Sequence, residues 1–191
     1  MEEIRKTASA YYGNCSEDQK KLVKSLFDKM VSKKDGGVTL SEYENNFEKL
    51  GLSCDIPKKS SLFDEIFKEK KTSFFNQLDK NGDGVLDFEE FITLFYLLSS
   101  GRLLFCKGNG CQVFLDEVFF SCPKCFKKPK KIITLCPNCY TNNNYSHKHP
   151  LVDNYAFLMT TQGPTSKVKT AIHIAHGGLF AFHAIHLCTI M

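Results

Sequence analysis

The stretch of sequence that decides the fold is Asp79-Lys80-Asn81-Gly82-Asp83-Gly84-Val85-Leu86-Asp87-Phe88-Glu89-Glu90. Side chains that carry oxygen stand at its first, third, fifth and ninth positions, and a glutamate ends it. Calcium takes six to eight oxygen ligands, and a glycine at the sixth position permits the sharp turn that gathers them around one ion. The stretch therefore predicts a calcium-binding loop with these ligands: Asp79, Asn81, Asp83, the backbone carbonyl of Val85, Asp87 through a water molecule, and Glu90 as a bidentate ligand.

Apolar residues at helical spacing flank this loop on both sides, and Gly101 stands where the second helix is expected to stop. A calcium loop between two such helices is an EF-hand, which we assign to residues 66–101. The apolar positions are Phe74, Phe75 and Leu78 before the loop, and Phe91, Leu94, Phe95 and Leu98 after it.

A second, incomplete loop lies upstream at residues 31–42. It has a glycine at position 6 and Glu42 at position 12, but positions 1 and 3 are Val31 and Lys33, whose side chains cannot coordinate calcium. We expect residues 18–53 to form a degenerate EF-hand that binds an ion weakly or not at all, with Val38 paired to Leu86 in a short strand. The alternative is a distorted but functional site.

The helices around the incomplete loop are also indicated by pattern. Ser16-Glu17-Asp18-Gln19 has the form of a capping box that starts a helix, and Gly51 is expected to end the helix that leaves the loop. Residues 16–101 are therefore predicted to be a four-helix EF-hand pair, preceded by an N-terminal arm at residues 1–15.

Composition divides the chain at the same place. The 191 residues are 42% hydrophobic and 24% charged, which excludes a disordered chain, a collagen-like repeat and a polytopic membrane protein. Residues 1–101 carry a net charge of −3 and two of the nine cysteines, whereas residues 102–191 carry +7 and the other seven. An acidic module joined to a basic, cysteine-rich module is expected.

The first six residues lack the apolar stretch of a secretory signal. We therefore expect a protein that is not secreted, located in the cytoplasm, with membrane association or the nucleus as alternatives. In a reducing compartment an odd number of cysteines favours metal sites over disulfides.

Eight metal-binding side chains lie within about 44 residues of the basic half, the right number for two tetrahedral zinc ions. Two of the cysteine pairs have the Cys-Pro-x-Cys spacing of zinc knuckles, and disulfide-linked pairs are the alternative. The candidate ligands are Cys106, Cys111, Cys122, Cys125, Cys136, Cys139, His147 and His149.

The order of these ligands, with both histidines last, resembles the ZZ-type zinc finger, a cross-braced module. That resemblance implies one zinc on Cys106, Cys111, Cys136 and Cys139, and a second on Cys122, Cys125, His147 and His149. With an EF-hand pair upstream, and with Phe119–Phe126, Leu135–Tyr140, His147–His149 and Asp153–Ala156 as they stand, residues 16–158 resemble plant EF-hand proteins that bear a C-terminal ZZ-like module. The module is assigned to residues 102–158, and the resemblance implies calcium and zinc binding but no reaction.

The last residues, 159–191, are predicted to be an apolar tail. Glycines and histidines interrupt it, so a membrane span is not favoured. The ending Cys188-Thr189-Ile190-Met191 is a Cys-a-a-X box, which makes Cys188 a candidate for farnesylation, with an unmodified tail as the alternative.

The fold expected from these patterns is mainly α-helical: an EF-hand pair of four helices and two loops, followed by a small zinc-stabilised cross-brace module with short strands. The function expected is calcium binding, as a sensor whose zinc module contacts a protein target in a calcium-dependent way, with Ca²⁺ and two Zn²⁺ per chain. A passive calcium buffer with a structural zinc finger is the alternative.

A phosphate or nucleic-acid partner for the lysines of residues 124–131 is disfavoured, because few aromatic residues accompany them. No enzyme is expected, because no catalytic triad, phosphate loop or open zinc site is present. Reversible membrane attachment through a prenylated C-terminus is a further expectation.

Overall fold

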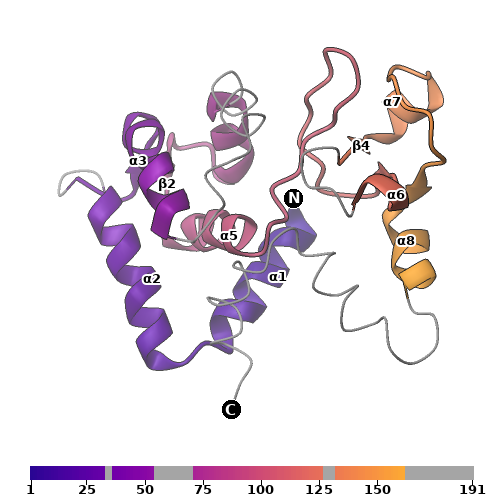
Figure 1. The fold of residues 1–191 in the computed structure, drawn as a ribbon. Coiled ribbons are helices and arrows are strands. Elements are labelled where there is room, and N and C mark those ends of the chain that lie inside the picture. The colour runs from indigo at the N-terminus through magenta and orange to yellow at the C-terminus, as the bar shows by residue number, and fades with distance from the viewer. Residues whose placement is uncertain (33–35, 54–70, 127–131, 162–191) are drawn as a thin grey trace. The chain divides into compact units, whose positions relative to one another are not determined.

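The computed structural model describes residues 1–32, 36–53, 71–126 and 132–161. It is mainly helical with a few short strands, as predicted from the sequence (Figure 1). The described residues form two compact units, residues 1–102 and residues from 103 onward. Within the described residues, no helix combines the length and the apolar character that crossing a membrane requires. The predictions on Asp35, on Lys127–Lys131 and on Cys188 fall outside the described residues.

The first unit contains most of the helices. Residues 71–78, which enter the predicted calcium loop, are helical. The other elements are α1 (Glu2–Gly13), α2 (Glu17–Met30), β1 (Val38–Thr39), α3 (Leu40–Ser53), β2 (Val85–Leu86) and α5 (Phe88–Ser99).

The start of α2 is the predicted capping box. The Ser16 hydroxyl accepts a hydrogen bond from the Gln19 backbone N–H, and the Gln19 side chain accepts one from the Ser16 N–H. Two backbone N–H groups that the helix leaves unpaired are thereby satisfied. The predicted end of the helix that leaves the first loop is wrong: α3 continues through Gly51 to Ser53. Glycine costs a helix interior only about 1 kcal/mol relative to alanine, which flanking helical residues can sustain.

The two predicted loops meet in a two-stranded antiparallel pairing. Val38 lies opposite Leu86 and Thr39 opposite Val85, which confirms the predicted partnership of Val38 and Leu86. Both of those side chains are fully buried. A Cβ added at Gly37 would lie 2.7 Å from the Leu86 carbonyl oxygen, so the close approach of the strands requires glycine there. The pairing joins the two hands through buried apolar contacts.

The N-terminal segment, predicted from the sequence to be an arm, is a helix. α1 packs against α5 and buries Ile4 and Ala8. The Tyr11 ring stacks on Tyr96, with ring centroids 5.4 Å apart. The spacing of residues 4, 8 and 11 on one helical face was the signal that could have revealed this helix.

The core of the first unit is aromatic. Phe27 of α2 makes edge-to-face contacts with Phe88 and Phe91 of α5, and Tyr43 of α3 packs on Phe47 and Phe75. α5 is buried along nearly its whole length, as expected of a helix that is apolar all round. It is therefore the central helix of this unit.

Cys15, which follows α1, is disulfide-bonded, contrary to the expectation that the cysteines avoid disulfides.

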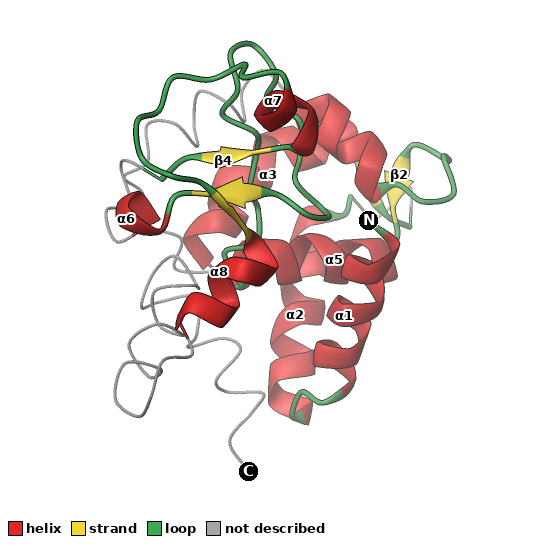
Figure 2. Ribbon diagram, turned by 90° about the vertical axis from the view of Figure 1, so that its right-hand side faces the viewer, coloured by secondary structure: helices red, strands yellow, loops and turns green. Residues whose placement is uncertain are grey.

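The second unit is built on a small antiparallel sheet of order β4-β3-β5 (Figure 2). Phe120 of the central strand lies opposite Leu135 on one side and Asp153 on the other. Its ring stacks on Tyr140 with 3.8 Å between centroids. The elements are β3 (Phe120–Ser121), α6 (Pro123–Phe126), β4 (Thr134–Leu135), α7 (Pro137–Thr141), β5 (Val152–Asp153) and α8 (Asn154–Thr161).

Candidate functional site

The calcium loop is organised by hydrogen bonds from its own backbone to its side-chain oxygens. Asp79 accepts from the N–H of Gly82 at 2.7 Å and of Gly84 at 2.9 Å. Gly82 and Gly84 have φ of 73° and 83°, the left-handed region that favours glycine. Because space is open around both glycines, backbone conformation and not packing is what requires them.

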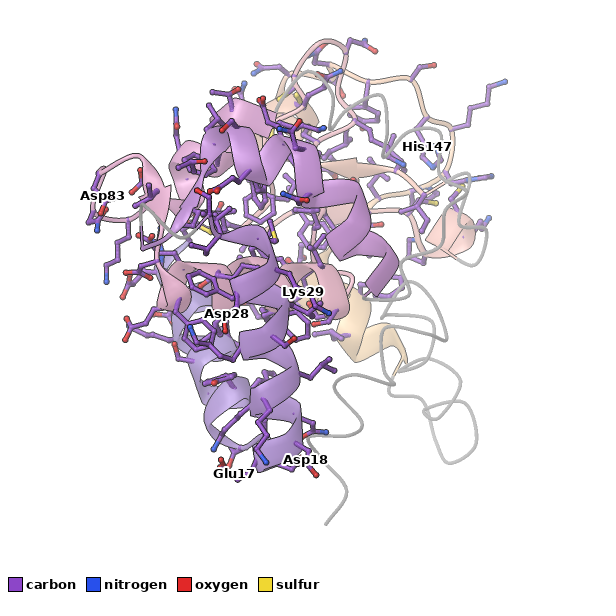
Figure 3. The ribbon with its side chains drawn as sticks, turned by 90° about the vertical axis from the view of Figure 1, so that its left-hand side faces the viewer. Glu17, Asp18, Asp28, Lys29, Asp83 and His147 are labelled. Atoms are coloured by element: carbon purple, nitrogen blue, oxygen red, sulfur yellow. The ribbon has the colours of Figure 1, made fainter. Side chains whose placement is uncertain are left out.

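The side chains at the third and fifth positions also turn back along the loop. The Asn81 amide oxygen accepts from the Asp83 N–H, and the Asp83 carboxylate accepts from the Val85 N–H, each at 3.0 Å. The Asn81 amide group donates to the other Asp83 oxygen at 2.9 Å. Figure 3 labels Asp83 in this exposed loop. The first half of the loop thus gathers three oxygen-bearing side chains along one turn.

Glu90 closes the loop. One carboxylate oxygen accepts from the Lys80 N–H at 2.6 Å and the other from the Asp87 N–H at 2.9 Å. The Asp87 carboxylate accepts from the Glu90 N–H, so the two residues form a reciprocal capping box at the start of α5. Glu90 is only 5% exposed. An all-oxygen donor set with this buried carboxylate at position 12 fits a calcium ion.

The first loop repeats this closing geometry without the side-chain ligands. Glu42 accepts from the Ser32 N–H at 2.6 Å, the Thr39 N–H at 2.8 Å and the Thr39 hydroxyl at 2.8 Å. Burial alone would raise the pKa of Glu42, but these hydrogen bonds outweigh burial and lower the pKa from 4.5 to about 2. Val31 stands at position 1 of the first loop, where the second loop has Asp79. The first loop therefore offers fewer ligand oxygens than the second.

The eight predicted zinc ligands fall into two groups, and the groups are those that the family resemblance implied. Within each group the ligand atoms all lie within 4.8 Å of one another. The first group is Cys106, Cys111, Cys136 and Cys139, and the second is Cys122, Cys125, His147 and His149. Each group has four soft or borderline ligands, which fits one tetrahedral zinc ion.

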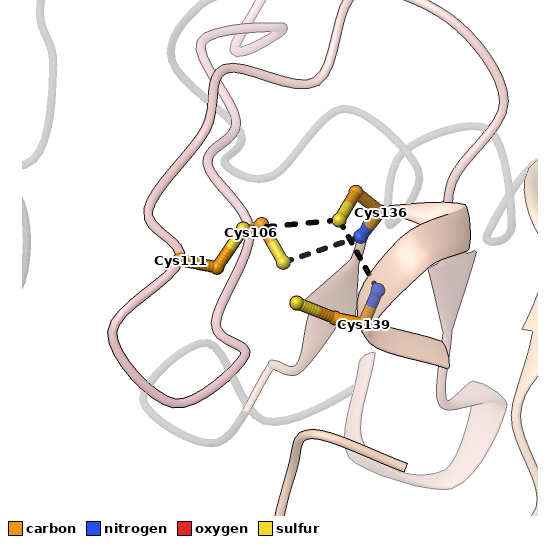
Figure 4. A group of neighbouring side chains, drawn as sticks. All are labelled: Cys106, Cys111, Cys136 and Cys139. Carbon is orange, nitrogen blue, oxygen red and sulfur yellow. Dashed lines mark hydrogen bonds between the residues drawn. The ribbon is translucent and has the colours of Figure 1, made fainter. Parts of the chain in front are cut away.

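The first cysteine group is formed where two segments meet (Figure 4). Cys136 caps the N-terminus of α7, and its sulfur accepts from the Cys139 N–H at 3.4 Å. The Cys106 sulfur accepts from the N–H groups of Gly108 at 3.3 Å and Cys136 at 3.2 Å. The sulfurs of Cys111 and Cys136 are 3.8 Å apart. Backbone donors aimed at sulfur stabilise the thiolate form that a metal requires.

Gly108 holds the first group closed. A Cβ added there would lie 2.4 Å from the Cys139 sulfur and 3.0 Å from the Asn144 carbonyl oxygen. Real Cβ atoms essentially never come as close as the contact with the sulfur. The chain can therefore pass this close to the sulfurs only with glycine at this position, a requirement that the sequence analysis missed.

The protonation of the first group is set by its environment. Burial raises the pKa of the Cys106 thiol to about 12 and also raises that of Cys139. For Cys136, burial acts in the same direction, but hydrogen bonds from the Cys139 N–H and the neighbouring thiols lower the pKa. A metal ion at this group must therefore displace protons from buried thiols, which couples its binding to pH.

The second group joins α6 to the loop before β5. The Cys125 sulfur lies 3.3 Å from His149 Nδ1 and 3.9 Å from His147 Nε2, and Figure 3 labels His147. Burial, followed by the nearby His149, lowers the pKa of His147. A neutral imidazole is the form that coordinates zinc. The lowered pKa therefore favours the form of His147 that can bind a metal.

Strand pairing explains why the two groups interleave. β3 leads directly into Cys122, and the adjacent strand β4 leads directly into Cys136, so two paired strands deliver one Cys-x2-Cys turn to each group. The remaining ligands of each group come from outside these strands. Each ligand group therefore brings together segments that are far apart in the sequence.

Two of the comparisons with known proteins found similar sequences. A family model described as EF hand matches residues 71–96. Protein S100-G of Rattus norvegicus is 39% identical over 80 residues, which is 40% of this chain and 87% of that protein. Protein S100-G of Equus caballus is 39% identical over 75 residues, which is 38% of this chain and 81% of that protein. No solved structure matches the chain.

Proposed function

The chain belongs to the EF-hand calcium-binding proteins, and on that premise we propose that it is a calcium sensor with a zinc-stabilised protein-interaction module. The observation that carries the proposal is the pairing of one complete loop with one degenerate loop through Val38 and Leu86. Because both side chains are buried and β1 leads directly into α3, this pairing links the complete loop to α3 of the other hand. A passive buffer is the competing function, since buffer EF-hands barely open when calcium binds.

The experiment that separates sensor from buffer compares surface exposure with calcium and with chelator. A sensor should increase the fluorescence of an apolar dye when calcium is added, and should retain a protein target from an extract in calcium but not in chelator. Glu90→Gln is the control, because it removes the bidentate ligand. If the protein binds calcium with full affinity but the dye signal does not change, the protein is a buffer.

We further propose that residues 102–158 bind two zinc ions, one on each ligand group, as in the ZZ-like modules of plant EF-hand proteins. The support is the clustering of the two ligand sets and the N–H donors aimed at Cys106 and Cys136. Zinc would serve structurally here, because four protein ligands leave no open position for substrate. Elemental analysis of protein purified under reducing conditions should find two zinc atoms per chain. Finding none would refute the assignment.

The remaining proposals follow from the sensor function. We propose that the protein has no catalytic activity, acts on a protein target in a calcium-dependent manner, and works in the cytoplasm, with membrane association or the nucleus as alternatives. Prenylation of Cys188 would provide reversible membrane attachment, which one lipid chain alone supports only marginally. Cell fractionation of Cys188→Ser beside the parent tests this point, and equal membrane fractions would refute it.

A further inference from the structure

α1 presents one apolar face to the EF-hand pair. Ile4 and Ala8 are buried, Tyr11 stacks on Tyr96 of α5, and the Tyr12 ring meets Phe88 edge-on with 5.7 Å between centroids. Residues 4, 8, 11 and 12 stand at i, i+4, i+7 and i+8. This is the spacing with which an amphipathic helix places its anchors in an apolar groove of a partner protein.

α1 also contacts the helix that enters the calcium loop. Arg5 Nη2 donates to the Gln77 carbonyl at 2.7 Å and reaches the Leu78 carbonyl at 3.4 Å, and these are the last two residues before the loop. Glu2 pairs with Lys80, at the second loop position, at 3.8 Å. Arg5 and Glu90 line one shared pocket between α1 and the loop. α1 therefore spans both flanks of the calcium site.

Contact with both flanks conflicts with the opening of the hand. In a sensor EF-hand, calcium changes the angle between the entering and leaving helices from about 130–140° to about 90–100°. A rigid helix bound to Gln77 on one side and packed on Tyr96 on the other cannot keep both contacts through that change. Among the described residues, the buried Arg5 Nε has no hydrogen-bond partner, so the contact is incompletely satisfied.

We propose that α1 is a built-in occupant of the target-binding surface on α5, and that calcium weakens its hold. The partner that replaces it is an amphipathic helix with apolar anchors at the spacing of Ile4, Ala8 and Tyr11, and with a small residue at the second anchor. This inference rests on the proposed sensor function. By thermodynamic reciprocity, if calcium weakens the docking of α1, then the docking of α1 weakens calcium binding by the same factor, and loss of that docking strengthens calcium binding by up to this factor.

The test measures calcium affinity by calorimetry in the full chain and in two variants. Arg5→Ala removes the tie to the entering helix. Lys6→Ala is the matched control, because it removes the same charge from the same helix but pairs with Glu3 of α1 at 2.9 Å. Arg5→Ala should bind calcium about fivefold or more tightly than the parent, within the range of allosteric couplings, and Lys6→Ala should match the parent. Equal affinities for Arg5→Ala and the parent, or equal gains in both variants, would overturn the proposal.

A second measurement needs no variant. Hydrogen exchange of the α1 amides in the parent should speed up about fivefold or more when calcium replaces chelator, while the amides of α2 act as the internal reference. Unchanged or slower exchange in α1 would overturn the proposal. If the dye signal rises with calcium while α1 exchange stays constant, this inference fails and the sensor function stands. If neither changes, both fail.

Discussion

Glu42 and Glu90 occupy equivalent positions in the two loops: each accepts hydrogen bonds from the backbone N–H groups ten residues and three residues before it. The equivalence extends to the loop starts. The N–H of Val31 donates to the Phe27 carbonyl, and the N–H of Asp79 donates to the Phe75 carbonyl. The first hand therefore keeps the frame of the second. It differs at the first position, where Val31 stands in place of the aspartate Asp79.

Glu90→Gln should weaken calcium binding by about a hundredfold or more, because it removes a bidentate ligand from the complete loop. Glu42→Gln is the matched control and should leave the affinity of that loop within a few-fold of the parent. Calorimetric titration of the three proteins measures this. If both variants lost the same amount of calcium affinity, the two loops would share the ion, or the glutamate at position 12 would control affinity in the same way in both loops.

Glu42→Gln should instead change how stability depends on pH. The pKa of Glu42 is lowered from 4.5 to about 2, so its carboxylate stabilises the fold fully above pH 4.5 and loses that contribution as the pH falls through about 2. The parent should therefore lose more stability across this window than the variant. Urea unfolding at intervals of pH measures the difference, and parallel curves would contradict the prediction.

Gly108→Ala should disrupt the first cysteine group, because the new methyl would collide with the Cys139 sulfur. Bound zinc should fall from two atoms per chain to about one, measured by elemental analysis under reducing conditions. Gly110→Asn is the control. Gly110 has φ of 71° with open space around it, a conformation that asparagine tolerates. Full zinc content in Gly108→Ala would show that the loop yields without cost to the site.

Removal of zinc should unfold the second unit and leave the first intact. Of the seven residues in the buried cluster around the ligand groups, four are cysteines of those groups and the others are Leu115, Ile133 and Leu135. Phe105 and Phe114 are the further buried apolar residues described in this unit. So small an apolar core cannot offset the conformational entropy of folding without metal. Chelation should abolish tertiary NMR signals from Leu135 and preserve those from Phe91. A preserved Leu135 signal would contradict the prediction.

Tyr43→Phe should stabilise the calcium-free protein by about 1 kcal/mol. The Tyr43 hydroxyl is buried and has no hydrogen-bond partner among the described residues, so the parent bears a desolvation penalty that phenylalanine removes. Tyr96→Phe is the control with the opposite sign, because its hydroxyl accepts from Arg102 at 3.0 Å. Urea unfolding in chelator measures both. A loss of stability in Tyr43→Phe would indicate a partner for the hydroxyl.

The calcium loop and the ligand groups could be predicted mostly from the local chemistry of the sequence. Positions 1, 3, 5 and 12 of a calcium loop are set by coordination, and a twelve-residue loop leaves Asp79 and Glu90 little freedom in where they lie. The capping box at Ser16 is likewise a contact over three residues, so the sequence determines it directly. The pairing of Val38 with Leu86 followed once the two loops were aligned.

Tertiary structure decided what depends on contacts between distant segments. α1 has the spacing of an amphipathic helix, but a twelve-residue helix is marginal alone, and its burial depends on the face that α5 offers. The need for glycine at position 108 arises from a sulfur thirty-one residues away. The sequence by itself determined which side chains can bind metal, because ligand chemistry is local. Which segments bury one another was decided by the fold, because burial is a property of pairs of surfaces that no single stretch contains.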